Sequence, residues 1–254
     1  MTRPIIKNEK GTSMLKRILL KARSLTRTKQ GAEVDFWQKE IKKYQKWFAG
    51  ELSPLYKTPS PKSDEKEKAP NLKDASILTW HKLHQEAKYL EDLQLTPDAF
   101  QGMKLLDIGS GPMPSATCFK GCRLYCLEPL LHKYLEIGFP LHYYENVTFI
   151  HGVSERMPVE DSSFDAVISD NAIDHVDDIR KTAAEIKRVL RTDGLFRMFV
   201  HYHPVTECEP INFDDDLFQE LFGWVTNLNK IKTSKEDYTK TLPDNESFVL
   251  WSNF

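Results

Sequence analysis

The chain has no long apolar run and is poor in cysteine. Its 254 residues include four cysteines, too few for a disulfide scaffold in a chain of this length. The apolar stretches last only a few residues, whereas roughly 18–20 are needed to cross a bilayer, and none resembles a secretory signal. We therefore expect a cytoplasmic protein, with a core drawn from the 40% of residues that are apolar.

Positive charge is scarce outside the N-terminal arm. Residues 1–30 hold nine Lys or Arg and one acidic residue, whereas the remainder holds 26 basic and 36 acidic residues. An acidic body lacks the clustered cations that phosphates require, so we expect no nucleic-acid partner. Apolar residues between 13 and 25 fall at helical spacing among basic ones. This segment is a helix packed on the body, a peripheral contact with the inner membrane surface, or a transit-type presequence.

The pattern along the chain changes near residue 100. Before it, residues 32–56 and 73–95 show helical periodicity, and residues 53–70 form a proline-rich, charged linker. After it, short β-rich runs alternate with helical patterns, which is typical of a parallel sheet built from βαβ units. The sequence thus predicts a basic arm (1–30), a helical extension with a linker (31–72) and one α/β domain (73–254). Strands are expected at 104–108, 123–127, 147–151, 165–169, 195–201, 224–231 and 247–252, and helices at 130–137, 178–190 (capped by Gly194) and 214–222.

The most informative motif is a strand that ends in Asp107 and breaks into the turn Gly109–Gly111. In a doubly wound sheet this turn lies at the carboxyl edge, where ligands bind. Glu128 ends the next predicted strand, 21 residues later, where an acid accepts hydrogen bonds from both ribose hydroxyls. Prolines at 112 and 114 remove N–H donors that a pyrophosphate site needs. The motif therefore favours a nucleoside ligand without a diphosphate over a nicotinamide dinucleotide.

Four ordered blocks within residues 100–205 resemble the class I S-adenosylmethionine-dependent methyltransferases, in particular the group related to quinone- and sterol-modifying enzymes. They are LLDIGSGPMPSA, YCLEP, VTFIHGVSERMPVEDSSFDAVISDNAIDHVDD and EIKRVLRTDGLFRMFV. The resemblance implies a Rossmann-like, seven-stranded, mostly parallel sheet with an N-terminal helical extension, and S-adenosylmethionine as cofactor. It also implies the binding residues: Asp107, Gly109, Ser110 and Gly111 at the methionine end, Glu128 at the ribose, Ser154 and Glu155 in the turn beside adenine, and Asp170 and Asn171 beside the sulfonium.

Two departures from the family pattern change details of this site. Many relatives carry an acid where Val153 stands, so the bond to the adenine amino group must come from Glu155 or from backbone. The proline-flanked turn at 112–114 replaces a glycine-rich one, which reshapes the methionine end. On the helix before the first strand, Trp80 and His84 are i,i+4 neighbours that either close over a ligand or simply pack.

Candidate catalytic residues come from loops that follow the predicted strands. Methyl transfer to an alcohol needs an aligned acceptor and a base. We expect His203 as the base, with His201 and then Asp170 as alternatives, and a structural role for His175. His201, His203, Cys208 and Glu209 are also metal-ligand types, but no further Cys or His follows them, so no metal site is predicted.

The function expected from these features is O-methylation of a small molecule or of a sugar or polysaccharide precursor. A quinone-type lipid is the alternative acceptor. A non-catalytic binding protein that keeps the fold is the alternative from another class. The sequence determines neither the acceptor nor the oligomeric state.

Overall fold

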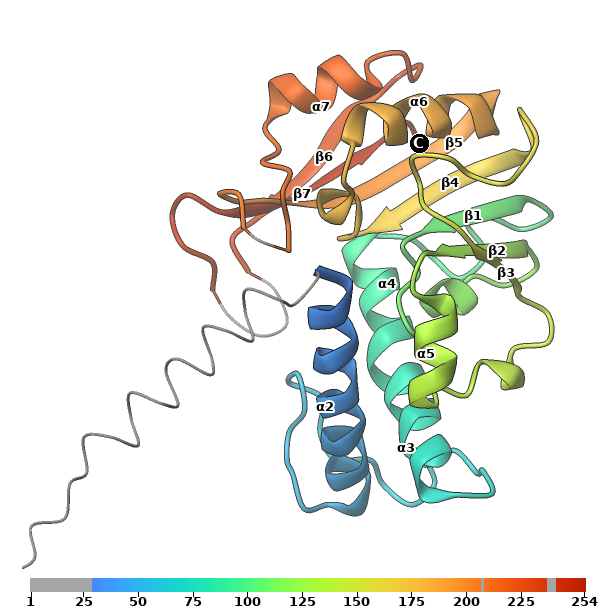
Figure 1. The fold of residues 1–254 in the computed structure, drawn as a ribbon, viewed down its shortest axis with the longest axis vertical. Coiled ribbons are helices and arrows are strands. Elements are labelled where there is room, and N and C mark those ends of the chain that lie inside the picture. The colour runs from blue at the N-terminus through green and yellow to red at the C-terminus, as the bar shows by residue number, and fades with distance from the viewer. Residues whose placement is uncertain (1–28, 207, 237–240) are drawn as a thin grey trace, which may run out of the picture.

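The computed structural model describes residues 29–206, 208–236 and 241–254. They build a seven-stranded sheet in the order β3-β2-β1-β4-β5-β7-β6, in which only β7 runs antiparallel to its neighbours (Figure 1). This confirms the expected mostly parallel, Rossmann-like sheet. The strands are β1 (Lys104–Ile108), β2 (Arg123–Glu128), β3 (Thr148–His151), β4 (Phe164–Asp170), β5 (Leu190–Tyr202), β6 (Asn229–Ser234) and β7 (Ser247–Ser252); the helices of the domain are α5 (Leu131–Ile137), α6 (Ile179–Val189) and α7 (Asp215–Phe222), with short 3-10 turns at Ser115–Cys118, Leu141–Tyr143 and η4 (Ile173–His175).

Alternating apolar residues on the central strands build two core layers, one on each face of the sheet. On one face Leu106 and Val167 pack with Ile186 of α6, and Figure 1 shows α6 and α7 side by side over this face. On the other face, Leu105 and Ile168 pack with residues of the helix that precedes β1. Because both faces are covered, the central strands are mostly apolar, and polar residues such as Asp170 at the end of β4 lie at the carboxyl edge.

Several boundaries differ from the sequence prediction: the first helix ends at Ala49 rather than near residue 56, and β5 begins at Leu190 rather than at residue 195. Two further differences have local reasons. Strand β6 begins at Asn229 rather than at residue 224, because the intervening residues form turns in which the Val225 and Leu228 amides donate to nearby carbonyls. The prediction of Gly194 as the cap of α6 was wrong: the helix ends at Val189 with Leu190 as its C-cap, and Gly194 lies within β5. A Cβ at Gly194 would lie 2.4 Å from Leu190 Cδ1, so this glycine provides space rather than a left-handed cap.

The N-terminal extension is helical, as expected, and packs at the carboxyl edge of the sheet. It comprises α2 (Lys29–Ala49) and, beyond the predicted limit at residue 72, a second helical rod made of α3 (Leu72–Trp80), the π-helical turn η1 (His81–Gln85) and α4 (Glu86–Asp92). Figure 1 shows both rods extending away from the sheet. The proline-rich segment between them is anchored: Leu55 is buried, and the Trp47 indole N–H donates to Thr58 and Pro59 carbonyls.

Within the described ranges, no helix combines the length and the apolar character that a transmembrane span requires. Residues 1–28, which include the amphipathic segment 13–25, lie outside the described residues.

Candidate functional site

A cavity of about 940 Å³ lies where β1, β2 and β4 end, beneath α2 and η1. Eight of the residues proposed from the sequence line it. They are Gly109, Ser110, Gly111, Glu128, Ser154, Glu155, Asp170 and Asn171. Three others, Asp107, His201 and His203, are not among the lining residues. Asp107 is fully buried, within reach of the Tyr89 hydroxyl at 3.3 Å.

The glycine turn after β1 needs both of its glycines. Gly109 and Gly111 have φ of +72° and +67°, which L side chains rarely adopt. A Cβ at Gly109 would lie 2.4 Å from the Ala172 Cβ, so the turn also needs the space. A Cβ at Gly111 would meet nothing within 4 Å, because that side of the turn faces the cavity. The turn is thus a cradle that a ligand can approach closely.

Glu128 joins this turn to the end of β2. Its Oε2 accepts the Gly111 amide at 3.0 Å and its Oε1 accepts the Leu130 amide at 2.8 Å. The residue is 4% exposed, and burial raises the pKa of its carboxyl to about 7, although the two backbone donors oppose this. Each carboxylate oxygen has a second lone pair. Glu128 can therefore accept further hydrogen bonds from a ligand in the cavity, and its role at the ribose stays a prediction.

The turn from Val153 to Glu155 forms another wall. The Ser154 hydroxyl lies 3.0 Å from the Thr182 hydroxyl of α6. Glu155 Oε1 accepts the Asp177 amide at 2.8 Å, so this carboxylate holds the start of α6 in place. The role of Glu155 in adenine recognition stays a prediction.

A buried ion network that the sequence analysis missed forms the wall beside β4. Lys88 of α4 lies 2.9 Å from both Asp170 carboxylate oxygens and 2.5 Å from Asp92. Burial alone would lower the pKa of Lys88, but the two carboxylates outweigh it and raise that pKa. Burial raises the pKa of Asp170, against the effect of Lys88. Lys88 falls four residues after His84, so the stripe that begins at Trp80 could have indicated it.

The residue after this network, Asn171, is held in an unusual conformation. Its φ is +52°, and its amide donates to the Phe199 carbonyl at 2.8 Å. Its side-chain Oδ1 is buried and has no hydrogen-bond partner within the described residues. Strained, unpartnered polar groups are common at ligand sites, and Asn171 lines the cavity.

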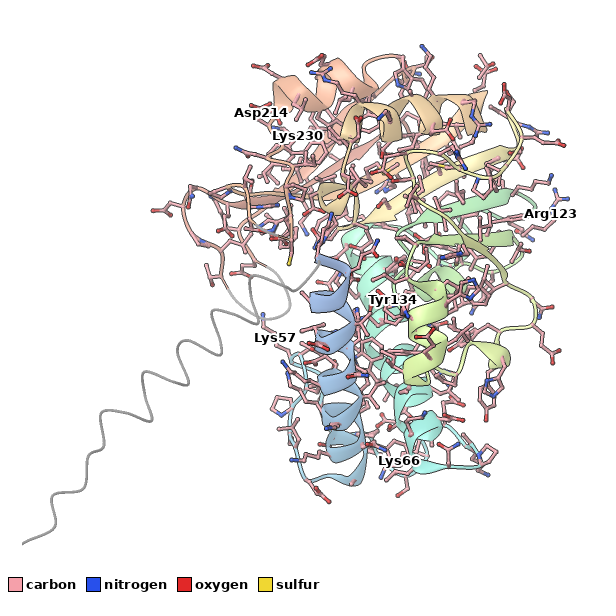
Figure 2. The ribbon with its side chains drawn as sticks, viewed as in Figure 1. Lys57, Lys66, Arg123, Tyr134, Asp214 and Lys230 are labelled. Carbon is pink, nitrogen blue, oxygen red and sulfur yellow. The ribbon has the colours of Figure 1, made fainter. Side chains whose placement is uncertain are left out.

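Aromatic residues of the extension close the cavity on the remaining side. Trp37 of α2 and Trp80 of α3 line it, and Trp80 also stacks on Tyr44 with ring centroids 4.1 Å apart. Glu33 of α2 accepts a hydrogen bond from the Tyr134 hydroxyl at 2.7 Å. Figure 2 labels Tyr134 on α5. A second cavity of about 330 Å³ shares the Trp37 and Trp80 walls and reaches His84. Trp80 therefore packs against Tyr44 and also lines both cavities.

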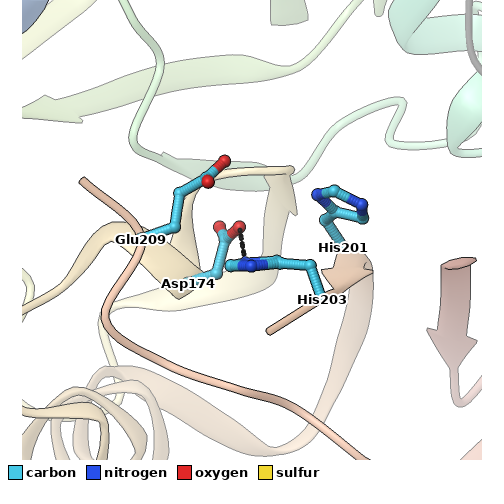
Figure 3. A group of neighbouring side chains, drawn as sticks. All are labelled: Asp174, His201, His203 and Glu209. Atoms are coloured by element: carbon cyan, nitrogen blue, oxygen red, sulfur yellow. Dashed lines mark ion pairs between the residues drawn. The ribbon is translucent and has the colours of Figure 1, made fainter. Parts of the chain in front are cut away.

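The histidines that end β5 lie in a separate cluster with Asp174 and Glu209 (Figure 3). His203 Nδ1 is 2.7 Å from the Pro204 carbonyl, and its Nε2 is 3.3 Å from Asp174 Oδ2. Asp174 raises the pKa of His203 to about 9, against the effect of burial. His203 lines no part of the cavity, and its assignment as the base stays a prediction. His175, which the sequence analysis treated as structural, does line the cavity.

Residues 106–198 match the methyltransferase domain family. The chain is 28% identical over 167 residues to an uncharacterized methyltransferase, YcgJ, of Bacillus subtilis, covering 64% of this chain and 61% of that protein. It is 32% identical over 107 residues to the sterol 24-C-methyltransferase ERG6B of Gibberella zeae, covering 39% of this chain and 27% of that protein. The chain thus spans less than two thirds of the length of either curated relative.

Solved structures share the fold at low identity. The crystal structure of YcgJ gives a TM-score of 0.51 at 18% identity, over 66% of this chain and 97% of that chain. A phosphoethanolamine N-methyltransferase 2 from Haemonchus contortus gives 0.54 at 15% identity, over 70% of this chain and 56% of that chain. At these identities the likeness shows the architecture of the sheet and its helices.

Proposed function

Because the domain around residues 106–198 belongs to the class I S-adenosylmethionine-dependent methyltransferase family, we propose that this chain methylates a hydroxyl oxygen of a small molecule or of a sugar precursor. The observation that carries the proposal is the Glu128 carboxylate, held by two backbone amides on the floor of the cavity beside a glycine cradle. S-adenosylmethionine, when bound there, supplies an activated methyl group on a positively charged sulfur.

The residues of the cavity would bind, orient and shield the reactants. Glu128 would accept the ribose hydroxyls, and the turn Gly109–Gly111 would let the methionine end lie against backbone. Asp170 would face the positive sulfonium, with Lys88 setting how much negative charge it presents. Trp37 and Trp80 would exclude water from the acceptor, which strengthens electrostatic interactions inside the cavity. Alignment of this kind can lower the activation free energy by about 7–11 kcal/mol.

We propose His175 as the proton acceptor in this reaction. It is the one histidine that lines the larger cavity within the described residues, and its side chain is 37% exposed. A ring exposed in the cavity can take the hydroxyl proton as the new carbon–oxygen bond forms and the sulfur keeps the electron pair of the broken bond. A positioned base typically contributes about 10²–10⁴-fold.

The acceptor class follows from the walls of the cavity. Aromatic rings together with His175, Glu209 and Asn171 offer stacking surfaces and hydrogen-bonding groups, which suit a polyhydroxyl molecule such as a sugar. A quinone-type lipid is the second candidate, because Phe36, Phe199 and Phe248 give the smaller cavity an apolar character. All four cysteines are free thiols, which supports the cytoplasm as the setting.

The test is methyl transfer by the full chain from labelled S-adenosylmethionine to a panel of sugars, nucleotide sugars and quinones, with products identified by mass spectrometry. We expect a hydroxyl-bearing acceptor to gain one methyl group. Calorimetry with S-adenosylhomocysteine separates the failures: binding without turnover on the panel leaves the non-catalytic binding protein, and no binding overturns the proposal.

A further inference from the structure

We propose that four side chains at the carboxyl end of β5 bind one divalent transition-metal ion. The four are Asp174, His201, His203 and Glu209 (Figure 3). Three of them, with Cys208, are ligand types that the sequence already places close together, but no metal was predicted because no further Cys or His follows to supply another ligand. The fold supplies that ligand from η4, the turn after the neighbouring strand β4. Glu209, rather than the adjacent cysteine, completes the group.

Unpartnered polar atoms gather at the centre of this cluster. Both Asp174 carboxylate oxygens and the Nε2 atoms of His201 and His203 are buried, and none has a hydrogen-bond partner within the described residues. The Asp174 side chain is 0% exposed. It approaches His203 at 3.3 Å without hydrogen-bonding geometry. Buried polar atoms are nearly always satisfied, so several together indicate a missing partner. A cation among them would satisfy all of them at once.

The orientation of His203 is a second, independent indication. Its Nδ1 hydrogen-bonds to the Pro204 carbonyl at 2.7 Å, which directs Nε2 toward Asp174. Metal-bound histidines almost always donate their other ring N–H to a carbonyl or a carboxylate, because that bond fixes the tautomer and the ring plane. His201 pairs with a carboxylate outside the four-residue cluster, because Glu246 Oε2 lies 3.2 Å from its Nε2.

The ligand chemistry and spacing select the class of ion. One donor atom from each residue lies within 4.8 Å of the other three. At metal–ligand distances of about 2.0–2.2 Å, the donors of a tetrahedral site lie about 3.3–3.6 Å apart, so the side chains must move inward by up to about an ångström to close the site. Two imidazoles with two carboxylates suit Zn²⁺, Fe²⁺ or Mn²⁺, whereas Mg²⁺ and Ca²⁺ prefer oxygen ligands alone.

Such an ion would join three segments of the chain. It would tie η4 and the end of β5 to the segment that carries Glu209, a residue that also lines the large cavity. The ion would therefore fix one wall of the cavity beside His175. The inference does not depend on methyl transfer, since metal uptake is measured without an acceptor.

The test is calorimetric titration of the metal-stripped full chain with ZnCl₂ in excess Mg²⁺. We expect one site, with affinity reduced at least about tenfold in Asp174→Asn and in His203→Gln. Cys208→Ser, adjacent to Glu209, is the matched control and should keep the affinity. His132→Gln controls for adventitious surface binding, because the His132 and His151 rings lie 4.3 Å apart. Equal affinity in the unaltered chain and both ligand variants would overturn the proposal.

A spectroscopic measurement on the unaltered chain covers the case in which a variant fails to fold. Co²⁺ bound by nitrogen and oxygen ligands should give visible d–d bands stronger than those of aqueous Co²⁺, without a sulfur-to-cobalt charge-transfer band. A spectrum equal to that of aqueous Co²⁺, or one with thiolate character, means that the cluster holds a proton-bridged ion pair only.

Discussion

Replacing Glu128 by glutamine tests the centre of the proposed cofactor site with almost no change in volume. The carboxylate accepts the Gly111 and Leu130 amides through different oxygens, and it faces the cavity. Glutamine has one acceptor oxygen, so its NH₂ group must point at one of the two backbone donors or at the ligand. Either arrangement removes at least one hydrogen bond to a charged acceptor.

The expected loss of affinity for the cofactor follows from the number of hydrogen bonds that the substitution removes. A hydrogen bond to a charged group contributes about 1.5–3 kcal/mol, which corresponds to a dissociation constant about 10- to 150-fold higher. The assay is isothermal calorimetry with S-adenosylhomocysteine. Glu136→Gln is the matched control, because Glu136 is an exposed carboxylate on α5, the helix that follows Glu128. We expect it to bind as tightly as the unaltered chain.

The same residue makes cofactor binding depend on pH. Burial raises the pKa of Glu128 to about 7 in the ligand-free protein, and the ribose hydroxyls favour the ionised form. Ionisation is complete above this pKa and is lost as the pH falls through it. The affinity for S-adenosylhomocysteine should therefore fall about tenfold from pH 8 to pH 6. In Glu128→Gln this dependence should disappear.

Two results would refute this reasoning. One is an affinity in Glu128→Gln within twofold of the unaltered chain, with an unchanged unfolding temperature. The other is a pH profile that the substitution leaves intact, because another group would then control binding.

Three further predictions concern the proton acceptor and the walls of the site. His175→Gln should lower kcat about 100-fold or more and leave S-adenosylhomocysteine binding intact; a kcat within threefold would remove His175 as the base. Lys88→Met should lower the free energy of unfolding in urea by about 1–3 kcal/mol, because the buried Asp170 carboxylate loses its cation. Lys181 forms an exposed ion pair, so Lys181→Met should change this free energy by less than about 0.5 kcal/mol. Equal effects of the two substitutions would contradict the prediction. Gly109→Ala should lower the free energy of unfolding by about 2–4 kcal/mol, because the strain of a positive φ adds to the clash with Ala172. Gly102 has a similar φ but open space, so Gly102→Ala should lower it by about 1–2 kcal/mol. Equal losses would show that the clash at Gly109 relaxes.

The sequence predicts those features that depend on neighbours along the chain. β1 and β7 begin and end at the predicted residues, because each is a short apolar run between clear breakers. The glycine turn and the acid that ends β2 line one cavity because parallel strands end at the same edge of a sheet. The limits of local reasoning are visible at Gly194, where a glycine near a helix end serves packing within β5.

Local pattern therefore determined the sheet, the helical extension and the glycine turn and acid that line one cavity. Tertiary structure alone decided which side chains meet across the edge of that sheet. Lys88 reaches Asp170 from 82 positions away, and Asp174 meets one histidine at the end of the neighbouring strand and one just after it. Such partners share no spacing along the chain, since the distance between them is set by how helices and loops pack, and packing is a property of the folded molecule.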